Sequence, residues 1–420
     1  MNGGDKERGG EPQPEWNFSS AWDSRLFEDL LSGGDLLCID VLGTQFSVRW
    51  GRSVTEEQRQ SMRSAWARCA SSGAPTLPPL PKEPTESLPF SASVSYLSMY
   101  DGGTFPLQAA SFAELAEVLT SRLTAAAILE NAGELMMLHA CAVASPETGA
   151  VVALVDKSGT GRTTAALVLA RTYGYVSDET VAIGPDGSVV PYPKPLSVKQ
   201  ESGAAKQQVG PDELGLQPAP AKPVIQSIVL LDRVGADQGA EPGADGQDHA
   251  PVLRQLPLAD ALFALIPDSS SQGEIDQPLQ SLCRLIDRVG GVWQVTYSEA
   301  ADLPKALEPL FRKRRRSKPE WAAVGLEAES GPIPDGWFRR VEPMDAVAVG
   351  DDLLVMLDSE IVRLSGIGPA VWEATAAAVP PDHLAEEVGA RHGRQEGYQA
   401  AVAAAAEQLI AKSVLERGSD

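Results

Sequence analysis

Apolar and polar residues follow two different periods in the first part of this chain. Residues 90–96 read FSASVSY, so apolar side chains alternate with serines, and a period of two predicts a half-buried β-strand. Residues 36–50 are rich in Leu, Val, Ile and Phe and predict another strand. Thr55 and Ser111 are each followed three positions later by Gln or Glu, a capping-box spacing that predicts a helix after each of them. The pattern therefore predicts an N-terminal lobe of α+β structure.

A different pattern begins near residue 150. Val151–Val155 is a short apolar run, and a turn rich in Gly, Ser and Thr follows it directly. An Ala- and Leu-rich segment then predicts a helix to about Arg171, and apolar runs near 175–183 and at 225–231 predict further strands. A strand, a tight glycine turn, a helix and another strand, in that order, are typical of an α/β nucleotide-binding core.

The C-terminal part of the chain has a third pattern. Short apolar runs separated by turn residues predict three strands, and three helical stretches follow them. The predicted strands are Ala346–Val349, Leu353–Leu357 and Ile361–Leu364, and the predicted helices lie near 369–377, 382–392 and 395–415. This order predicts a compact α+β module of the winged-helix-like type. Trp372 lies in the first of these helices, and we expect it in the core rather than in contact with a ligand.

Together these patterns divide the chain into five parts. They are a disordered polar tail (1–20), an N-terminal α+β lobe (21–130), an α/β domain with a glycine-rich loop (131–310), a basic linker (311–336) and the small α+β module (337–420). The linker contains the basic block 312–318. We expect this block to be a solvated segment, with contact to a peptide, a phosphate or a nucleic acid as the alternative.

Charge and cysteine content restrict the functional classes. The chain has 57 acidic and 35 basic residues and a net charge of −22, which argues against a nucleic-acid or anionic-membrane partner because such surfaces need clustered cations. Cys38, Cys69, Cys141 and Cys283 are far apart, so neither a zinc finger nor a disulfide scaffold is expected. The polar start lacks a signal peptide, and no apolar run is long enough to cross a bilayer. We therefore expect a cytoplasmic protein.

The turn after residue 155 carries the strongest chemical motif. A P-loop has the pattern G-x-x-x-x-G-K-[ST], in which backbone N–H groups surround a phosphate, Lys reaches its oxygens and Ser or Thr holds Mg²⁺. Here Gly161 and Thr163 are in place, whereas Asp156 replaces the first glycine and Arg162 replaces the lysine. The predicted nucleotide-binding residues are Ser158, Gly159, Thr160, Gly161, Arg162, Thr163 and Thr164. We expect a phosphate cradle with impaired phosphoryl transfer, and an ordinary glycine-rich turn is the alternative.

The flanking segments give the motif a context. His139-Ala140 precedes the loop, Asp178-Glu179 follows the next strand, and Pro193-Lys194-Pro195 comes after that. This ordered set resembles the HPr kinase/phosphorylase-like P-loop ATPases over about residues 130–310, in a degenerate form. The resemblance implies that Asp178 is a general base or lies beside a metal, that Glu179 and Thr163 hold Mg²⁺, and that His139 lies near the acid. It implies ATP and Mg²⁺ as cofactors. Because of the two loop substitutions, we expect them to be bound weakly or not at all.

Two residues have alternatives that the sequence leaves open. Asp232 ends an apolar strand and is a rival Walker-B-like acid by pattern, although a solvated residue at a strand end is the simpler interpretation. His139 is equally consistent with a structural histidine that is satisfied by its neighbours.

The C-terminal module resembles the PqqD-like domains over about residues 338–420. The resemblance rests on AVAVGDDLLVMLD (346–358), IVRL (361–364), GPAVWEA (368–374) and the LAEEV helix (384–388). It implies recognition of the leader of a ribosomally synthesised and post-translationally modified peptide, which adds a strand beside the third β-strand and leans on the last helix, around 399–410. The implied peptide-binding residues are Glu360, Ile361, Val362, Arg363 and Leu364.

Three functional hypotheses follow. The first is a recognition scaffold that binds a precursor peptide and presents it to a modifying enzyme, with a degenerate kinase-like body. The second is an ATP-dependent kinase that phosphorylates the precursor on Ser or Thr, and the third is a nucleotide-dependent regulator. Asp156 and Arg162 favour the scaffold. Residues after Pro319 include 18 acidic and 7 basic side chains, so we expect a leader with basic residues.

Overall fold

The structure is a computed structural model that describes residues 36–72, 88–96, 103–156, 161–198, 206–234, 250–312 and 318–419. The predicted disordered tail, loop residues 158–160 and most of the basic block lie outside the described residues. The described parts form a mixed α/β protein with several sheets, one of which combines parallel and antiparallel strands. Within these parts, no helix has the length and apolar character needed to cross a membrane.

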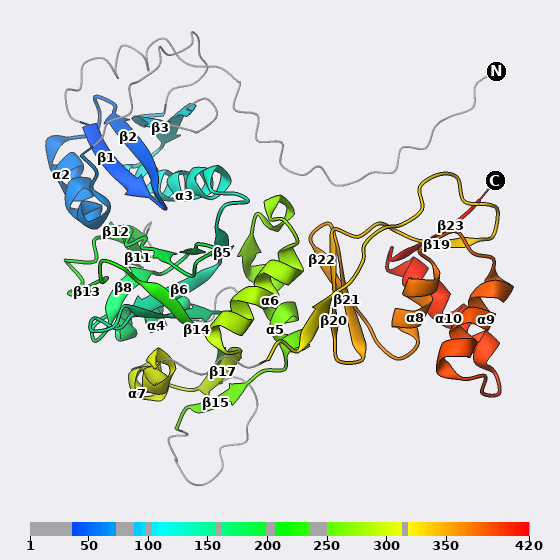
Figure 1. Cartoon of the computed structure of the whole chain (residues 1–420). Coiled ribbons are helices and arrows are strands. Elements are labelled where there is room, and N and C mark those ends of the chain that lie inside the picture. Colours follow the sequence, from blue (N-terminus) through cyan, green and yellow to red (C-terminus); the bar gives the residue numbers. More distant parts are fainter. Residues whose placement is uncertain are drawn as a thin grey trace, which may run out of the picture.

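The N-terminal lobe is an antiparallel sheet with two helices against it (Figure 1). Its elements are β1 (Leu36–Val41), β2 (Thr44–Trp50), α2 (Glu56–Ala65), β3 (Phe90–Tyr96), β4 (Gly103–Ala109) and α3 (Phe112–Glu130). Both predicted helix starts are confirmed: Thr55 forms a reciprocal capping box with Gln58, and the Ser111 hydroxyl accepts from the Glu114 N–H. Buried aromatic side chains of β2 and the segment after α2 fill the core between them.

The body is built on a sheet with the strand order β13-β8-β6-β7-β14-β17-β15. Its strands are β6 (Ala140–Ala144), β7 (Ala150–Val155), β8 (Gly174–Ser177), β13 (Gln217–Pro218), β14 (Val224–Arg233), β15 (Val252–Gln255) and β17 (Val292–Tyr297). Strands β7, β14 and β17 run parallel. Helices α4 (Arg162–Leu169) and α7 (Leu303–Leu307) cover one face, and α5 (Leu258–Leu265) and α6 (Pro278–Val289) cover the other.

Two small sheets join the body to the lobe. One has the order β10-β9-β5-β16, with β5 (Met136–Leu138), β9 (Val181–Ile183), β10 (Val189–Val190) and β16 (Ser269–Ser270), and the other pairs β11 (Leu196–Val198) with β12 (Gln207–Val209). Neighbouring side chains of β5 pack in different cores, since Met137 packs in the lobe and Leu138 packs in the body. Because side chains alternate between the two faces of a strand, β5 contributes to both cores.

The C-terminal module contains an antiparallel sheet with the order β18-β20-β21-β22 and a two-stranded ribbon, β19-β23. Its strands are β18 (Trp321–Ala323), β19 (Phe338–Arg340), β20 (Asp345–Val349), β21 (Asp352–Leu357), β22 (Glu360–Leu364) and β23 (Leu415–Arg417), and its helices are α8 (Gly368–Ala374), α9 (Pro381–His392) and α10 (Tyr398–Ala411). The three predicted strands and three predicted helices are confirmed. The prediction of only three strands is wrong, because β19 and β23 form a ribbon within the predicted module and β18, in the predicted linker, pairs with β20. Each of these strands has three residues, which is too short to give a period.

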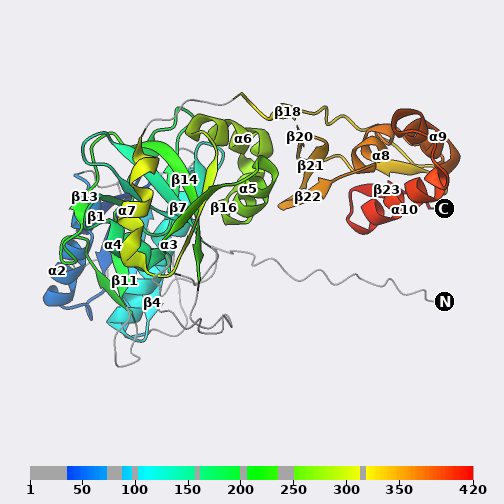
Figure 2. The same cartoon turned by 90° about the horizontal axis from the view of Figure 1, so that it is seen from below.

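The module sheet is buried on both faces. One face packs on α8, α9 and α10 through residues such as Val355 and Leu364, and Trp372 is fully buried there, as predicted. The other face packs on α5 and α6 of the body through Val347, Leu354 and Met356. Figures 1 and 2 show the orange and red module on the side of the body that carries α5 and α6. The module is therefore docked on the body rather than held by a linker alone.

A buried carboxylate fixes this contact. Asp345, at the start of β20, is 0% exposed. Its oxygens accept hydrogen bonds from the backbone N–H of Gln280 (2.9 Å), from the Gln280 side-chain amide (2.9 Å) and from the Ala346 N–H (2.8 Å). Because Gln280 lies in the first turn of α6, the carboxylate also faces the positive end of that helix.

Candidate functional site

β7 ends at Val155 and α4 begins at Arg162, so the predicted glycine-rich loop connects them in the chain, and its residues 157–160 lie outside the described residues. Asp156 follows β7 and is buried, and Gly161 caps α4 with φ +133°, a conformation that favours glycine. The hydroxyl of Tyr297, at the end of the parallel strand β17, lies 3.6 Å from the position that a Cβ at residue 161 would take. Burial raises the pKa of Tyr297 to about 12, and the nearby Asp156 adds to the rise. A carboxylate and a phenol therefore lie near Gly161, at the start of α4.

The guanidinium that replaces the P-loop lysine is directed at the backbone. Arg162 Nη1 donates a hydrogen bond to the carbonyl oxygen of His139 (2.8 Å). His139 in turn lies beside Asp268, with 3.9 Å between Nδ1 and the carboxylate. Partial burial lowers the pKa of His139, and the charge on Arg162 lowers it further. Arg162 thus stabilises the connection between β5 and β6.

The predicted acidic pair shares a buried cation. Lys194 Nζ lies 3.0 Å from the carboxylate of Asp178 and 3.2 Å from that of Glu179. Asp178 is buried and also accepts from the Tyr175 hydroxyl (2.9 Å), whereas the side chain of Glu179 is 39% exposed. Burial opposes the charge on Lys194, but the two carboxylates outweigh it and raise the pKa of the ammonium. Lys194 is therefore charged at neutral pH.

This cluster does not fit a magnesium ion. Mg²⁺ binds carboxylate oxygens in a near-octahedral shell, and the ammonium of Lys194 already occupies the space between the two carboxylates. Over the described ranges, no group of three or more His, Cys, Asp or Glu residues is placed to hold a metal ion. Asp178, Glu179 and Lys194 instead form an ion cluster that is buried at Asp178 and Lys194 and reaches the surface at Glu179.

Asp178 and the loop residue Arg162 lie close enough to the buried Cys141 to act on its charge. The pKa of the Cys141 thiol is raised by burial first and then by the charge of Asp178, and the charge of Arg162 opposes the rise. Asp232, the rival acid, is exposed at the end of β14 and accepts hydrogen bonds from Gln294 and Thr296.

Lys194 is the residue that sequence reasoning missed. Its signal was a single lysine between two prolines in the segment 193–195. The segment was part of the resemblance, but nothing in the sequence placed its ammonium between Asp178 and Glu179.

The predicted peptide-binding strand, β22, lies at the edge of its sheet, opposite to β18. A two-residue loop joins it to β21, with Leu357 opposite Glu360 and Val355 opposite Val362. In an antiparallel hairpin of this kind these are the hydrogen-bonded pairs, and bonded and non-bonded residues alternate. The N–H and C=O groups of Ile361 and Arg363 therefore point away from β21, toward the free edge.

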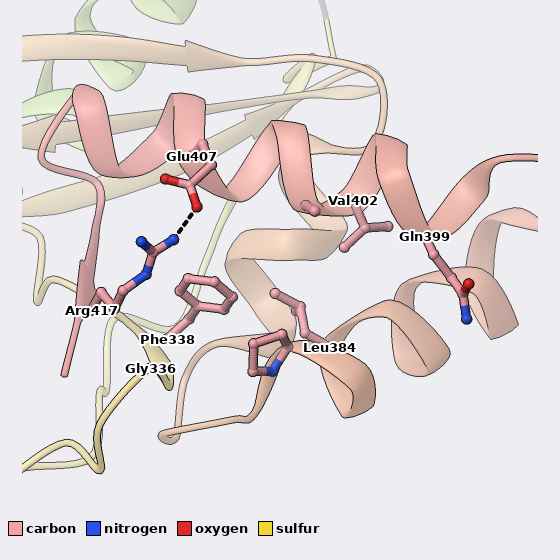
Figure 3. Close-up of a pocket in the computed structure, with 9 residues that line it drawn as sticks. Gly336, Phe338, Leu384, Gln399, Val402, Glu407 and Arg417 are labelled. Atoms are coloured by element: carbon pink, nitrogen blue, oxygen red, sulfur yellow. Dashed lines mark hydrogen bonds and ion pairs between the residues drawn. The ribbon is translucent and has the colours of Figure 1, made fainter. Parts of the chain in front are cut away.

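Helix α10, the last helix of the module, shares a hydrophobic core with β22 but contacts other elements. Helix α10 packs on α8, α9 and β23, and it shares a hydrophobic core with β22 through Leu409 and Leu364. A cavity of about 350 Å³ lies on its side facing α9 and the β19-β23 ribbon. Figure 3 shows Phe338, Leu384 and Val402 around this cavity, with the ion pair between Glu407 and Arg417 at one end. This cavity is separate from the edge of β22.

The chain matches no protein-family model and no curated protein. The two sites described above are therefore the features of this chain that bear on its function.

Proposed function

We propose that this protein recognises the leader of a precursor peptide in the biosynthesis of a ribosomally synthesised and post-translationally modified peptide, and presents it to a modifying enzyme. The module is interpreted as a PqqD-like domain and the body as a degenerate HPr kinase-like P-loop domain. We place the protein in the cytoplasm, where such precursors are made.

The observation that carries the proposal is the edge strand β22. Its outward N–H and C=O groups, at Ile361 and Arg363, have no strand beside them in the described part of the chain. An extended peptide that pairs with such an edge gains main-chain hydrogen bonds, and pockets for alternate side chains give it specificity. The helices behind the sheet hold the strand in place by burying Leu364.

The contacts of the predicted nucleotide-binding and catalytic residues in the body argue against the kinase hypothesis. Arg162 is bonded to the His139 carbonyl, and Lys194 forms ion pairs with both predicted catalytic carboxylates. Phosphoryl transfer needs a cation on the transferred phosphate and a free base for the acceptor hydroxyl. We therefore assign the body a structural role, with nucleotide bound weakly or not at all.

Peptide binding to the edge strand tests the proposal. A phage-displayed library of random peptides about twelve residues long is selected against the full chain, and the selected peptide is labelled for fluorescence polarisation. Arg363→Pro removes an outward ladder donor and is expected to weaken binding at least about tenfold. Arg363→Ala, which keeps the N–H, separates the loss of the side chain from the loss of the backbone bond.

A second control uses the opposite edge of the same sheet. The Val324 N–H donates to the Ala346 carbonyl, so the alternation places the Ala323 N–H on the free side of β18. Ala323→Pro is expected to leave the affinity unchanged. Selection of no peptide, or equal affinity for the protein and for Arg363→Pro, contradicts the proposal. Transfer of radiolabelled phosphate from ATP to the peptide, lost in Asp178→Asn, would instead establish the kinase.

A further inference from the structure

The edge strand β22 lies between two different domains. Its side chains alternate: Ile361 packs against the core that includes α5 and α6 of the body, whereas Val362 and Leu364 pack against the core of α8 to α10. Arg363 also points to the body side, because its guanidinium contacts Asp260 of α5 at 3.3 Å. Figure 2 shows β22 between α5 and the helices of the module.

A strand added to β22 must continue this alternation. Side chains on neighbouring strands share the two faces of a sheet in register. Residues of the added strand opposite Ile361 and Arg363 therefore face the body, and the residue opposite Val362 faces the module helices. On the body side, α5 carries Asp260 and, one helical turn later, the half-buried Phe263.

The charges around the edge define the partner. Arg363 contacts two acidic side chains, Asp260 of α5 at 3.3 Å and Asp352 of the hairpin. The two hairpin turns add the acids Asp351 and Asp358, and β22 begins at Glu360, so the sequence of this edge is acidic. Asp352 holds Arg363 on the sheet, and hydrogen bonds from Ser365 and then Arg363 lower the pKa of that carboxyl. A cationic side chain beside Asp260 is therefore favoured, while an acidic one is repelled.

We propose that the peptide-binding site is shared between the two domains. In this arrangement α5 of the body forms one wall and the module helices form the other. Its occupant is an extended peptide whose body-facing positions carry a basic side chain beside Asp260 and an apolar one beside Phe263. The inference rests on the proposed function, and it adds that the degenerate body contributes directly to the choice of peptide.

Photo-crosslinking with the selected peptide tests this arrangement without altering the protein. p-Benzoylphenylalanine is placed at each position of the peptide in turn, and the residues of the full-length protein that it labels are mapped by mass spectrometry. Alternate peptide positions are expected to label α5 and the module helices. In addition, Asp260→Ala is expected to weaken binding about threefold, as for a partly exposed ion pair. Glu274→Ala, at an exposed acid elsewhere on the body, is expected to have no effect.

The outcomes separate this inference from the proposed function. Labelling of the module helices alone, with no label on α5, overturns the shared site and leaves strand addition to β22 intact. Labelling of neither α5 nor the module helices overturns both. The shared site is supported if alternate peptide positions label both walls and if replacing the basic residue of the peptide weakens binding to the unaltered protein but not to Asp260→Ala.

Discussion

Replacement of Asp345 by alanine is the most direct test of how the module is held on the body. The fully buried carboxylate accepts from two backbone N–H groups, those of Gln280 and Ala346, and from the Gln280 amide. Asp345→Ala leaves these donors buried without an acceptor, at about 1–3 kcal/mol for each unsatisfied group. It also removes a favourable charge from the start of α6, worth about 0.5–1 kcal/mol.

The expected loss is about 3–5 kcal/mol, because the Gln280 amide can turn and water can reach part of the site. Guanidinium unfolding of the full chain, followed by tryptophan fluorescence and circular dichroism, measures the change. Asp345→Asn keeps one acceptor oxygen and is expected to lose about half as much.

Glu342→Ala provides a matched control, since Glu342 is an exposed acid three residues earlier in the same segment. It is expected to change the free energy of unfolding by less than about 0.5 kcal/mol. A loss below about 1 kcal/mol for Asp345→Ala would refute the assignment of this carboxylate as the anchor of the interface.

The other predictions concern the body and its contact with the module. Lys194→Met removes the cation shared by Asp178 and Glu179 and is expected to lower the free energy of unfolding by about 3–5 kcal/mol at neutral pH; a loss below about 1 kcal/mol by guanidinium unfolding would show that the cluster is not held by charge. His139 has a pKa below 6.5 in the folded protein, so the unfolded state binds its proton first and stability falls as the pH drops below 6.5. His139→Gln is expected to flatten this part of the stability–pH curve, and an unchanged slope would contradict the shift. Trp321→Phe removes the 2.8 Å hydrogen bond from Nε1 to Asp287 and is expected to cost about 1 kcal/mol of stability, measured in the same unfolding assay.

Local patterns in the sequence predicted the elements of the module, because short-range signals decide them. Turns at 350–351 and 358–359 separate the strands in the structure, whereas Asp352, which was predicted in the first turn, begins β21. The sequence also held a signal for the interface with the body. Residues 353–356 read LLVM without alternation, and a continuous apolar run is typical of a strand covered on both faces. The identity of the second covering layer, α5 and α6, required the fold.

The candidate sites depended on register and on distance in space, which a single sequence does not give. Nothing in the order of Ile361, Val362 and Arg363 indicates which amides point outward, and a shift of one residue would reverse the answer. Lys194 is separated from Asp178 by 16 positions in the chain. Its contact with that carboxylate arises because the segment after β10 returns to the end of β8.

Amide hydrogen exchange along β22 tests the central claim most directly. In the free protein the Val362 N–H is bonded to β21, while those of Ile361 and Arg363 face the free edge. On addition of the selected peptide, exchange at Ile361 and Arg363, followed residue by residue by nuclear magnetic resonance, is expected to slow strongly. Val362 is expected to be protected in both states. Unchanged exchange rates at Ile361 and Arg363 in the presence of bound peptide would contradict strand addition at this edge.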